Sequence, residues 1–209
     1  MDNAAQFMTQ HDFSMKLRMR INRYCMRKHE DPSLNEDVSD KVMAMLSPPL
    51  RRTCMAHIHA EAVKRNALFA TALKSRGEGA EEVISELCDL LRLRTYGPDE
   101  YIYGEDMVVD EMYFIREGRV QMEDWAEDDL LAVWTLSVPD SFGSYHLIFE
   151  VDSFIAAHSM TFVVAAILKR DDCAGVLKRY PSLVAPMRRQ CIKELCGRMF
   201  RALTARFLH

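Results

Sequence analysis

The side chains of this sequence that could do chemistry are its cysteines, a pair of histidines and a cluster of carboxylates. His57 and His59 could suggest a metal site, but they are two residues apart and so point to different faces of a helix. No Cys-x-x-Cys pair occurs, so the sequence predicts no zinc site and no other metal site. Scattered reduced thiols are typical of a cytosolic protein, and packing is their usual role. The cysteines are Cys25, Cys54, Cys88, Cys173, Cys191 and Cys196.

Carboxylates cluster between Glu123 and Asp129, with Trp125 among them. This segment is either a site for a cation or a partner, or the solvated tip of a hairpin. The sequence shows no Ser, Cys or His in an arrangement that would activate a nucleophile, and no paired carboxylates in an evident cleft. We therefore expect no enzymatic activity.

Length and charge bound the class of protein. With 209 residues, of which 49% are apolar, the chain can bury a core and form one domain, with or without an appendage. Its net charge of −4 gives no reason to expect binding to nucleic acid. No run of 18 apolar residues occurs, and the N-terminus lacks the pattern of a signal peptide. We expect no direct insertion of this fragment into a membrane.

The first third of the chain predicts helices. Apolar residues recur at helical spacing over residues 4–30, interleaved with Lys and Arg, with a break near 11–14. This basic amphipathic pattern is that of a helix that binds a membrane surface, calmodulin or a partner helix, or of a solvated basic face over an apolar seam. Pro32 ends that segment, and further helices are expected over 35–46, 50–66 and 80–91.

From Tyr96 to Lys169 short apolar runs alternate with Gly, Pro and Asp, which predicts many short strands joined by tight turns. Gly118 stands between two such runs, where a tight hairpin is expected. One helix-compatible segment, residues 144–149, interrupts the strands. Two helices follow, Cys173 to Tyr180, capped by Asp171 and Asp172, and Leu183 to Leu208.

Two motifs carry a resemblance to a known family. Met-Tyr-Phe-Ile-x-x-Gly-x-Val stands at Met112–Val120, and Ser-Phe-Gly stands at Ser141–Gly143. The sequence resembles the cyclic-nucleotide-binding domains of cyclic-nucleotide-gated, hyperpolarisation-activated and ether-à-go-go channels. Leu34-Asn35-Glu36-Asp37 and Leu46-Ser47-Pro48-Pro49-Leu50-Arg51 look like the C-linker, the helices that join such a domain to the pore.

The resemblance implies an α+β fold with two regions. A helical C-linker of α-hairpins is expected over 1–66. A cyclic-nucleotide-binding-like domain is expected over 67–209, with an antiparallel, jelly-roll-like β-roll over about 94–168, a short cassette helix, and C-terminal lid helices over 171–208. The family has Gly in two turns of the roll where this chain has Asp99 and Asp106, and Asp tolerates positive φ better than most residues.

The resemblance also implies a phosphate-binding cassette, which reads Phe-Gly-Glu and then Arg-Thr-Ala-Ser in the family. Phe142 and Gly143 match, but Ser144 stands where the ribose-binding Glu belongs. Ser153 replaces the Arg that pairs with the phosphate, and Phe154 replaces the Thr. Side chains that could compensate in part are His158 on the roll and Arg198 and Arg201 on the lid helix.

A simple count agrees with this comparison. No Lys or Arg lies between Arg119 and Lys169, whereas eight carboxylates do. Loss of a buried charged partner typically costs about 2–5 kcal/mol, or roughly 30- to 4,000-fold in affinity. Binding of cAMP or cGMP is therefore disfavoured, and no other cofactor is implied. The carboxylates are Glu123, Asp124, Glu127, Asp128, Asp129, Asp140, Glu150 and Asp152.

The sequence thus favours the cytoplasmic portion of a membrane protein, a gating and assembly module of a cation channel or a related transporter with a degenerate cassette. Its expected partners are the transmembrane pore domain of the same polypeptide and three further copies, since family C-linkers form a four-fold ring. Two alternatives remain: a regulatory domain that binds cAMP or cGMP and gates the channel, or a regulatory subunit of a cyclic-nucleotide-dependent enzyme.

Overall fold

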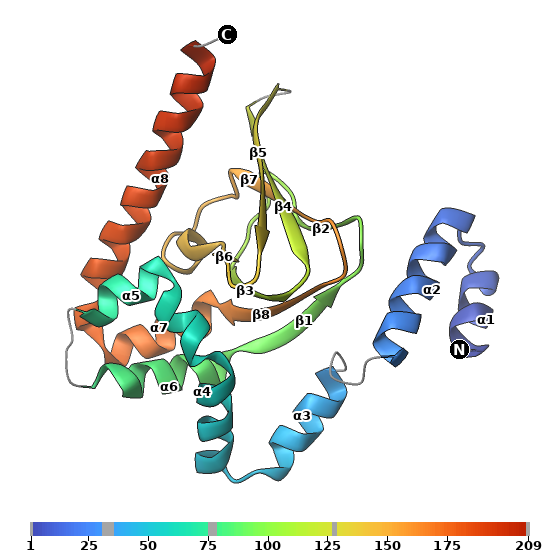
Figure 1. Ribbon diagram of the computed structural model, residues 1–209, viewed down its shortest axis with the longest axis horizontal. Helices are drawn as coiled ribbons and strands as arrows, with labels where there is room; N and C mark the ends of the chain where they lie inside the picture. The colour runs from blue at the N-terminus through green and yellow to red at the C-terminus, as the bar shows by residue number, and fades with distance from the viewer. Residues whose placement is uncertain (1, 31–35, 75–78, 127–128, 208–209) are drawn as a thin grey trace.

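The structure, a computed structural model, describes residues 2–30, 36–74, 79–126 and 129–207 (Figure 1). Side chains are described within these ranges except at 2–5, 28–30, 36–40, 126, 129, 131 and 198–207. Before the strands come α1 (Asp2–Gln10), α2 (Met15–Glu30), α3 (Glu36–Met45), α4 (Pro48–Arg65), α5 (Ala67–Lys74) and α6 (Ala80–Leu90). After the strands come α7 (Arg170–Arg179), a 3₁₀ turn η3 (Pro181–Leu183) and α8 (Val184–Phe207).

The strands form two antiparallel sheets of four, so the expectation of a mixed helix and sheet fold is confirmed. The first sheet has the order β1-β8-β3-β6, built from β1 (Arg92–Tyr96), β8 (Val163–Lys169), β3 (Glu111–Glu117) and β6 (Ser141–Phe142). The second has the order β2-β7-β4-β5, built from β2 (Glu100–Tyr103), β7 (Ile155–Ser159), β4 (Arg119–Ala126) and β5 (Asp129–Ser137). A short 3₁₀ helix, η2 (Ser144–Leu147), follows β6, where a helix-compatible segment was expected.

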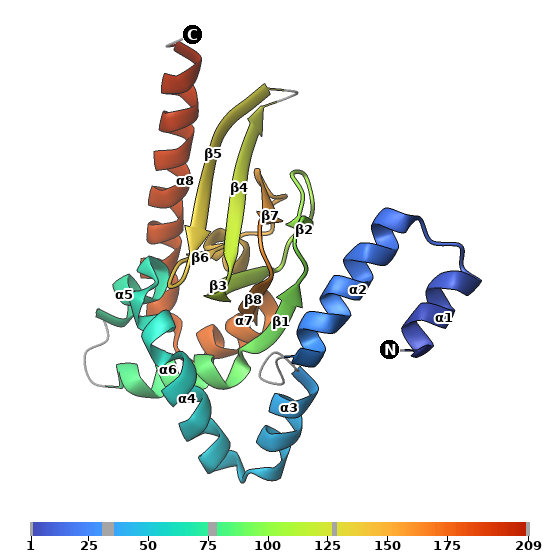
Figure 2. The same ribbon diagram turned by 45° about the vertical axis from the view of Figure 1, so that its right-hand side comes forward.

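Two hydrophobic cores share the first sheet. Helices α6 and α7 lie under the first sheet in both views, with α5 beside them (Figures 1 and 2), and apolar side chains of the three helices pack with Met112, Phe114 and Leu168. The opposite face of the same strands presents Tyr113, Ile115 and other side chains to the interior between the two sheets. Successive residues of a strand point to opposite faces, so β3 and β8 contribute to both cores.

Gly118 is a corner rather than the turn of a hairpin. It separates β3 from β4, but these strands belong to different sheets and do not pair with each other. Its φ is +86°, and a Cβ there would stand 2.2 Å from the carbonyl oxygen of Phe162. The expected hairpin at Gly118 is therefore wrong: glycine is needed because the chain changes sheets against another backbone segment.

Local signals placed several other elements correctly. Asp99 and Asp106 have φ of +56° and +55°, as expected for Asp at turn positions of this kind. The break near 11–14 separates α1 from α2, and the hydroxyl of Ser14 accepts a hydrogen bond from the amide of Leu17.

The predicted cap of the helix after the strands is wrong. Helix α7 begins at Arg170 rather than Cys173, so Asp171 and Asp172 lie in its first turn instead of capping it.

Helices α1 to α3 extend away from the sheets (Figures 1 and 2). On α2 the ring of Tyr24 lies 5.8 Å from that of Phe162, beside β8, and the guanidinium of Arg27 lies 5.9 Å from the same ring. Among the described residues, no helix is both long and apolar enough to cross a membrane.

Candidate functional site

A cavity of about 350 Å³ lies between α8 and the two sheets, next to η2. Aromatic and apolar side chains form its walls on the sheet side, among them Tyr103, Trp134 and Phe142. Polar side chains of α8 form the opposite side, namely Gln190, Lys193 and Glu194. The arrangement is that of a small-molecule site, with apolar walls and a few convergent polar groups.

The backbone turn at Gly143 positions the polar residue Ser144 at one end of the cavity. Gly143 has φ of +78° and precedes η2, and a Cβ at this position would stand 2.9 Å from the carbonyl oxygen of Glu111. Only glycine fits this turn without displacing β3. The turn places Ser144 at the start of η2, where its side chain faces α8.

Glu194 holds the polar groups of this end. The hydroxyl of Ser144 donates a hydrogen bond of 2.9 Å to one carboxylate oxygen of Glu194, and the amide nitrogen of Gln190 donates one of 2.9 Å to the other. Both oxygens of the carboxylate are thus bound within the protein. A negative charge fixed beside Ser144 repels any phosphate that approaches η2.

The structure brings three of the predicted site residues together at this cavity. Phe142, Gly143 and Ser144 all line it. The ring of Phe142 is stacked on that of Tyr113, with centroids 4.8 Å apart and an interplanar angle of 8°, so the cassette is anchored to β3.

Three other predicted residues do not line the cavity. Ser153 is fully buried, and its hydroxyl donates to the carbonyl of Ile155 at 2.7 Å and lies 3.2 Å from the hydroxyl of Tyr145. Phe154 is half exposed and stacks on the ring of Tyr145. His158 lies on the outer face of β7, where its ring is 4.8 Å from that of Tyr101.

Arg198 and Arg201 lie on α8, but their side chains are outside the described residues. Among the described residues that line the cavity, Lys193 is the one with a cationic side chain, and it is exposed.

Arg170, at the start of α7, does not line the cavity and instead binds backbone carbonyl groups. It donates to the carbonyl oxygen of Val109 at 2.7 Å and also to that of His146, so it fastens η2 to the body of the domain.

A partly buried ion pair lies on β1 and β3, near the turn at Gly143. Arg94 donates two hydrogen bonds, of 2.7 and 2.9 Å, to the two carboxylate oxygens of Glu111, and Tyr113 donates a third, of 2.9 Å. Burial raises the pKa of Glu111, but the hydrogen bonds from Arg94 and Tyr113 outweigh it and hold that pKa below its usual range. The pair joins β1 to β3 across the intervening β8, and Glu111 is also the residue whose carbonyl oxygen leaves no room for a Cβ at Gly143.

Sequence reasoning missed Gln190, Lys193 and Glu194 as residues of the site. A usable signal existed, since Gln190 and Glu194 are one turn apart on a helix whose Met187 and Cys191 are buried. What could not be read from spacing is which side of α8 faces the cavity.

The described residues contain no group of three or more His, Cys, Asp or Glu side chains that could hold a metal ion. The lining of the cavity offers a ligand apolar contact and hydrogen bonding with Ser144, Gln190, Lys193 and Glu194. The aromatic walls favour a flat or apolar ligand, and Glu194 favours a neutral or positively charged one over an anion. Comparison with known proteins adds no relative: no family model matches the sequence, and neither does any curated protein.

Proposed function

We propose that this chain is a cytoplasmic gating and assembly module of a cation channel or related transporter, whose cassette does not bind cyclic nucleotide in the usual way. The motifs at Met112–Val120 and Ser141–Gly143, which resemble those of channel nucleotide-binding domains, support this proposal. The pore would belong to the same polypeptide, as in ether-à-go-go-type potassium channels, whose homologous domains do not depend on nucleotide.

The observation that carries the proposal is the position of Glu194. A cyclic nucleotide presents one phosphate anion, which needs a cationic partner or free amides and hydroxyls. Here Ser144 is bound to the carboxylate of Glu194, and Ser153, at the position of the family's Arg, is buried and bonded elsewhere. The cavity thus offers a fixed negative charge where the ligand would bring its own.

The order of elements also supports the proposal. Helices α1 to α4 precede the sheets, as the C-linker does in the family, and α8 lies over the cavity, as the lid helix does. A jelly-roll-like β-roll is the finer description that two sheets of four antiparallel strands suggest.

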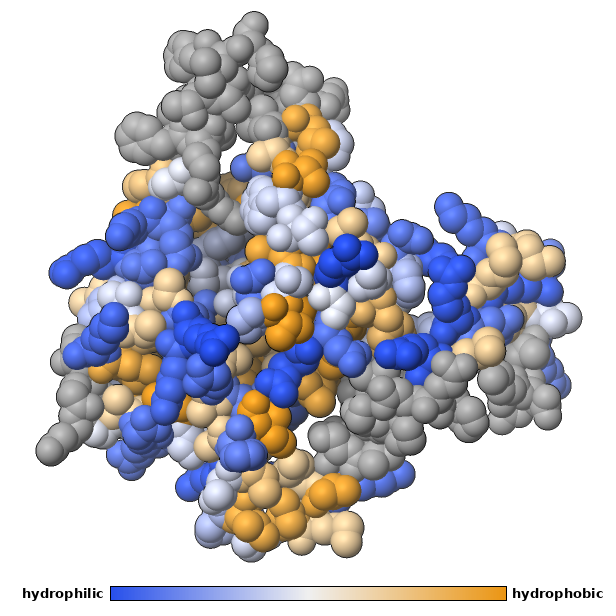
Figure 3. All heavy atoms as spheres, viewed as in Figure 1, coloured by the Kyte–Doolittle hydropathy of each residue, from blue (hydrophilic) through white to orange (hydrophobic). Residues whose placement is uncertain are grey.

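Exposed apolar side chains on the first helices support assembly. Val42, Met45 and Leu50 are 49%, 85% and 51% exposed, and they gather where α3 meets α4, the orange region at the bottom of Figure 3. Apolar surface repeated round a closed ring would be buried by neighbouring copies, so we propose a homotetramer formed through these helices.

Isothermal titration calorimetry with cAMP and with cGMP, up to millimolar concentration, tests the ligand part of the proposal. Wild-type protein is expected to give no saturable heat. Glu194→Gln removes the repelling charge and should allow weak binding, whereas Glu82→Gln, an exposed change on α6, should not. Saturation of the wild-type protein in the micromolar range would overturn the proposal in favour of classical ligand gating.

Light scattering after size exclusion tests the assembly part. The wild-type chain should approach the mass of four copies as its concentration rises. Leu50→Glu and Met45→Glu should shift it to the monomer, since each puts a charge on the apolar surface. A wild-type monomer at every concentration would refute assembly through this fragment.

A further inference from the structure

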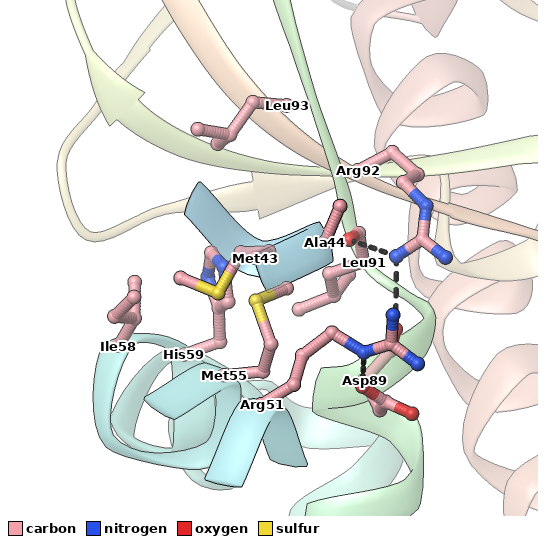
Figure 4. A pocket seen from close by; sticks show the side chains of 10 residues that line it. All are labelled: Met43, Ala44, Arg51, Met55, Ile58, His59, Asp89, Leu91, Arg92 and Leu93. Atoms are coloured by element: carbon pink, nitrogen blue, oxygen red, sulfur yellow. Dashed lines mark hydrogen bonds and ion pairs between the residues drawn. The ribbon is translucent and has the colours of Figure 1, made fainter. Parts of the chain in front are cut away.

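A second cavity, of about 230 Å³, lies where the first helices meet the sheets, far in sequence from the cassette. Figure 4 shows residues of α3 and α4 on one side and the junction of α6 with β1 on the other. Met43, Met55, Leu91 and Leu93 give it apolar walls. None of these residues belongs to the cavity under α8.

His59 is the polar group at one end of this second cavity. Its side chain is 2% exposed, and its Nδ1 has no hydrogen-bond partner among the described residues. Burial, followed by the nearby charge of Arg116, lowers the pKa of His59 to about 4, so the imidazole is neutral at pH 7. A buried polar atom without a partner is costly, which points to a ligand atom that completes the pair.

At the other end, Arg51 and Arg52 form ion pairs with the carboxylate of Asp89, whose Oδ1 is buried and has no hydrogen-bond partner among the described residues, and Arg92 lies beside them. Three guanidinium groups against one carboxylate leave this end positively charged, so it can accept an anion in spite of Asp89. Arg51 Nε lies 3.7 Å from Asp89 Oδ1, longer than a hydrogen bond. Arg92 Nη1 donates to the backbone carbonyls of Asp89 and Leu91, at 2.9 Å each. Neither Arg51 nor Arg92 therefore makes a two-point pair with a carboxylate, the geometry for which guanidinium is best suited.

Figure 4 shows His59 and the arginines on opposite sides of the cavity, with Met55 between them and Met43 next to His59. A ligand that satisfies both ends must carry an anionic group, an apolar middle and a second polar atom. Methionine adapts to varied apolar shapes, so the middle of the ligand need not be rigid.

We propose that this cavity binds a small carboxylic acid with an apolar chain and a hydroxyl or oxo group at its far end. The carboxylate pairs with Arg51 and Arg92, the chain packs on Met43 and Met55, and the far oxygen meets His59 Nδ1. A cavity of about 230 Å³ holds about nine non-hydrogen atoms, in proportion to the cavity of about 150 Å³ that accommodates benzene.

Such a ligand would act on the junction between the first helices and the sheets. It would touch α3, α4 and the start of β1 at once, and so hold α3 against the domain. This site is independent of the cavity under α8, with which it shares no residue, and it does not rest on the proposed function.

The test uses the whole chain and ω-hydroxy acids of four, six and eight carbons. Calorimetry should show saturable binding of at least one of them with a dissociation constant of about 1 mM or tighter. The matching plain fatty acid should bind about 2- to 10-fold more weakly, because it lacks the oxygen for His59. The matching diol should bind more weakly still, because it lacks the charge.

Variants locate the site. Arg51→Gln should weaken binding of the best acid about tenfold or more, whereas Arg65→Gln, an exposed arginine on the same helix, should leave it unchanged. His59→Leu should abolish the difference between the hydroxy acid and the plain acid. Proton NMR of the wild-type histidines gives a readout that does not rely on any variant, since the His59 ring signals should move on binding.

Three results would each overturn the proposal. One is the absence of saturable binding by every acid of the series. Another is equal binding of the hydroxy and plain acids with no movement of the His59 signals. The third is equal weakening by Arg51→Gln and Arg65→Gln, which would place the acid on the general basic surface of the helices.

Discussion

Replacing Arg94 with Met should reveal how strongly the partly buried ion pair of Arg94 and Glu111 stabilises the contact between β1 and β3. The side chain of Glu111 is 11% exposed and that of Arg94 is 43% exposed. Breaking a buried pair by removing one partner typically costs about 3–5 kcal/mol, and the partial exposure of Arg94 reduces this to about 2–3 kcal/mol. For a chain of 209 residues, this loss corresponds to a fall in Tm of roughly 4–12 °C.

The pH dependence separates this effect from a simple loss of packing. The pKa of Glu111 is lowered in the folded protein, so its stabilisation is present above the unfolded value of about 4.3 and is lost as the pH falls through the lowered value. In Arg94→Met, burial without its partner raises that pKa. The deficit of the variant should therefore be largest near pH 7 and should shrink below about pH 5.

Urea unfolding followed by circular dichroism at several pH values measures this deficit. Arg65→Met is the matched control, because Arg65 pairs with Glu61 on the surface of α4, with side chains 58% and 71% exposed. That control should lose about 0.3–0.5 kcal/mol or less. The reasoning is refuted if Arg94→Met costs no more than the control, or if its cost is the same at pH 4 as at pH 7.

Three further outcomes follow from single residues. Gly118→Ala should destabilise the protein by several kcal/mol, because φ is positive there and the new Cβ would stand 2.2 Å from a backbone oxygen. Gly175→Ala should instead stabilise α7 by up to about 1 kcal/mol, because its Cβ would meet no atom within 4 Å. Thermal unfolding of the two variants compares these effects. Because the pKa of His59 is lowered to about 4, stability should fall by up to about 3 kcal/mol as the pH drops from about 6.5 to 4, as measured by urea unfolding. His59→Leu should remove that dependence, and the exposed His57→Gln should retain it.

Local signals in the sequence were sufficient where the cause is local. The positive φ of Asp99 and Asp106 follows from the turn chemistry of Asp, and the helix break near Ser14 follows from its capping hydroxyl. Gly118 was recognised as a required glycine but was assigned to the wrong turn. A hairpin and a corner both need positive φ there, and the difference lies in distant pairing partners.

Tertiary contacts decided the features that the sequence left open. Helix α7 starts early because the amide of Arg170 is bound by the carbonyl of Asp110 and its side chain by the carbonyl of Val109. Glu194, the acidic residue of the cavity under α8, is 50 residues from the Ser144 that it binds. No spacing rule connects residues so far apart, so the hydrogen bond between Ser144 and α8 could be found only in a structure.

The first sheet is a single layer of strands that separates the two hydrophobic cores. In β3 and β8, Tyr113 and Ile167 face the interior between the sheets, whereas Phe114 and Ala166 face the helices. A slip of one residue in either strand would exchange the contents of both cores. Neither compartment can therefore be completed before this strand pair has found its register. The helical layer and the sheets should consequently fold as a single cooperative unit, with the slowest amide hydrogen exchange of the chain in β3 and β8.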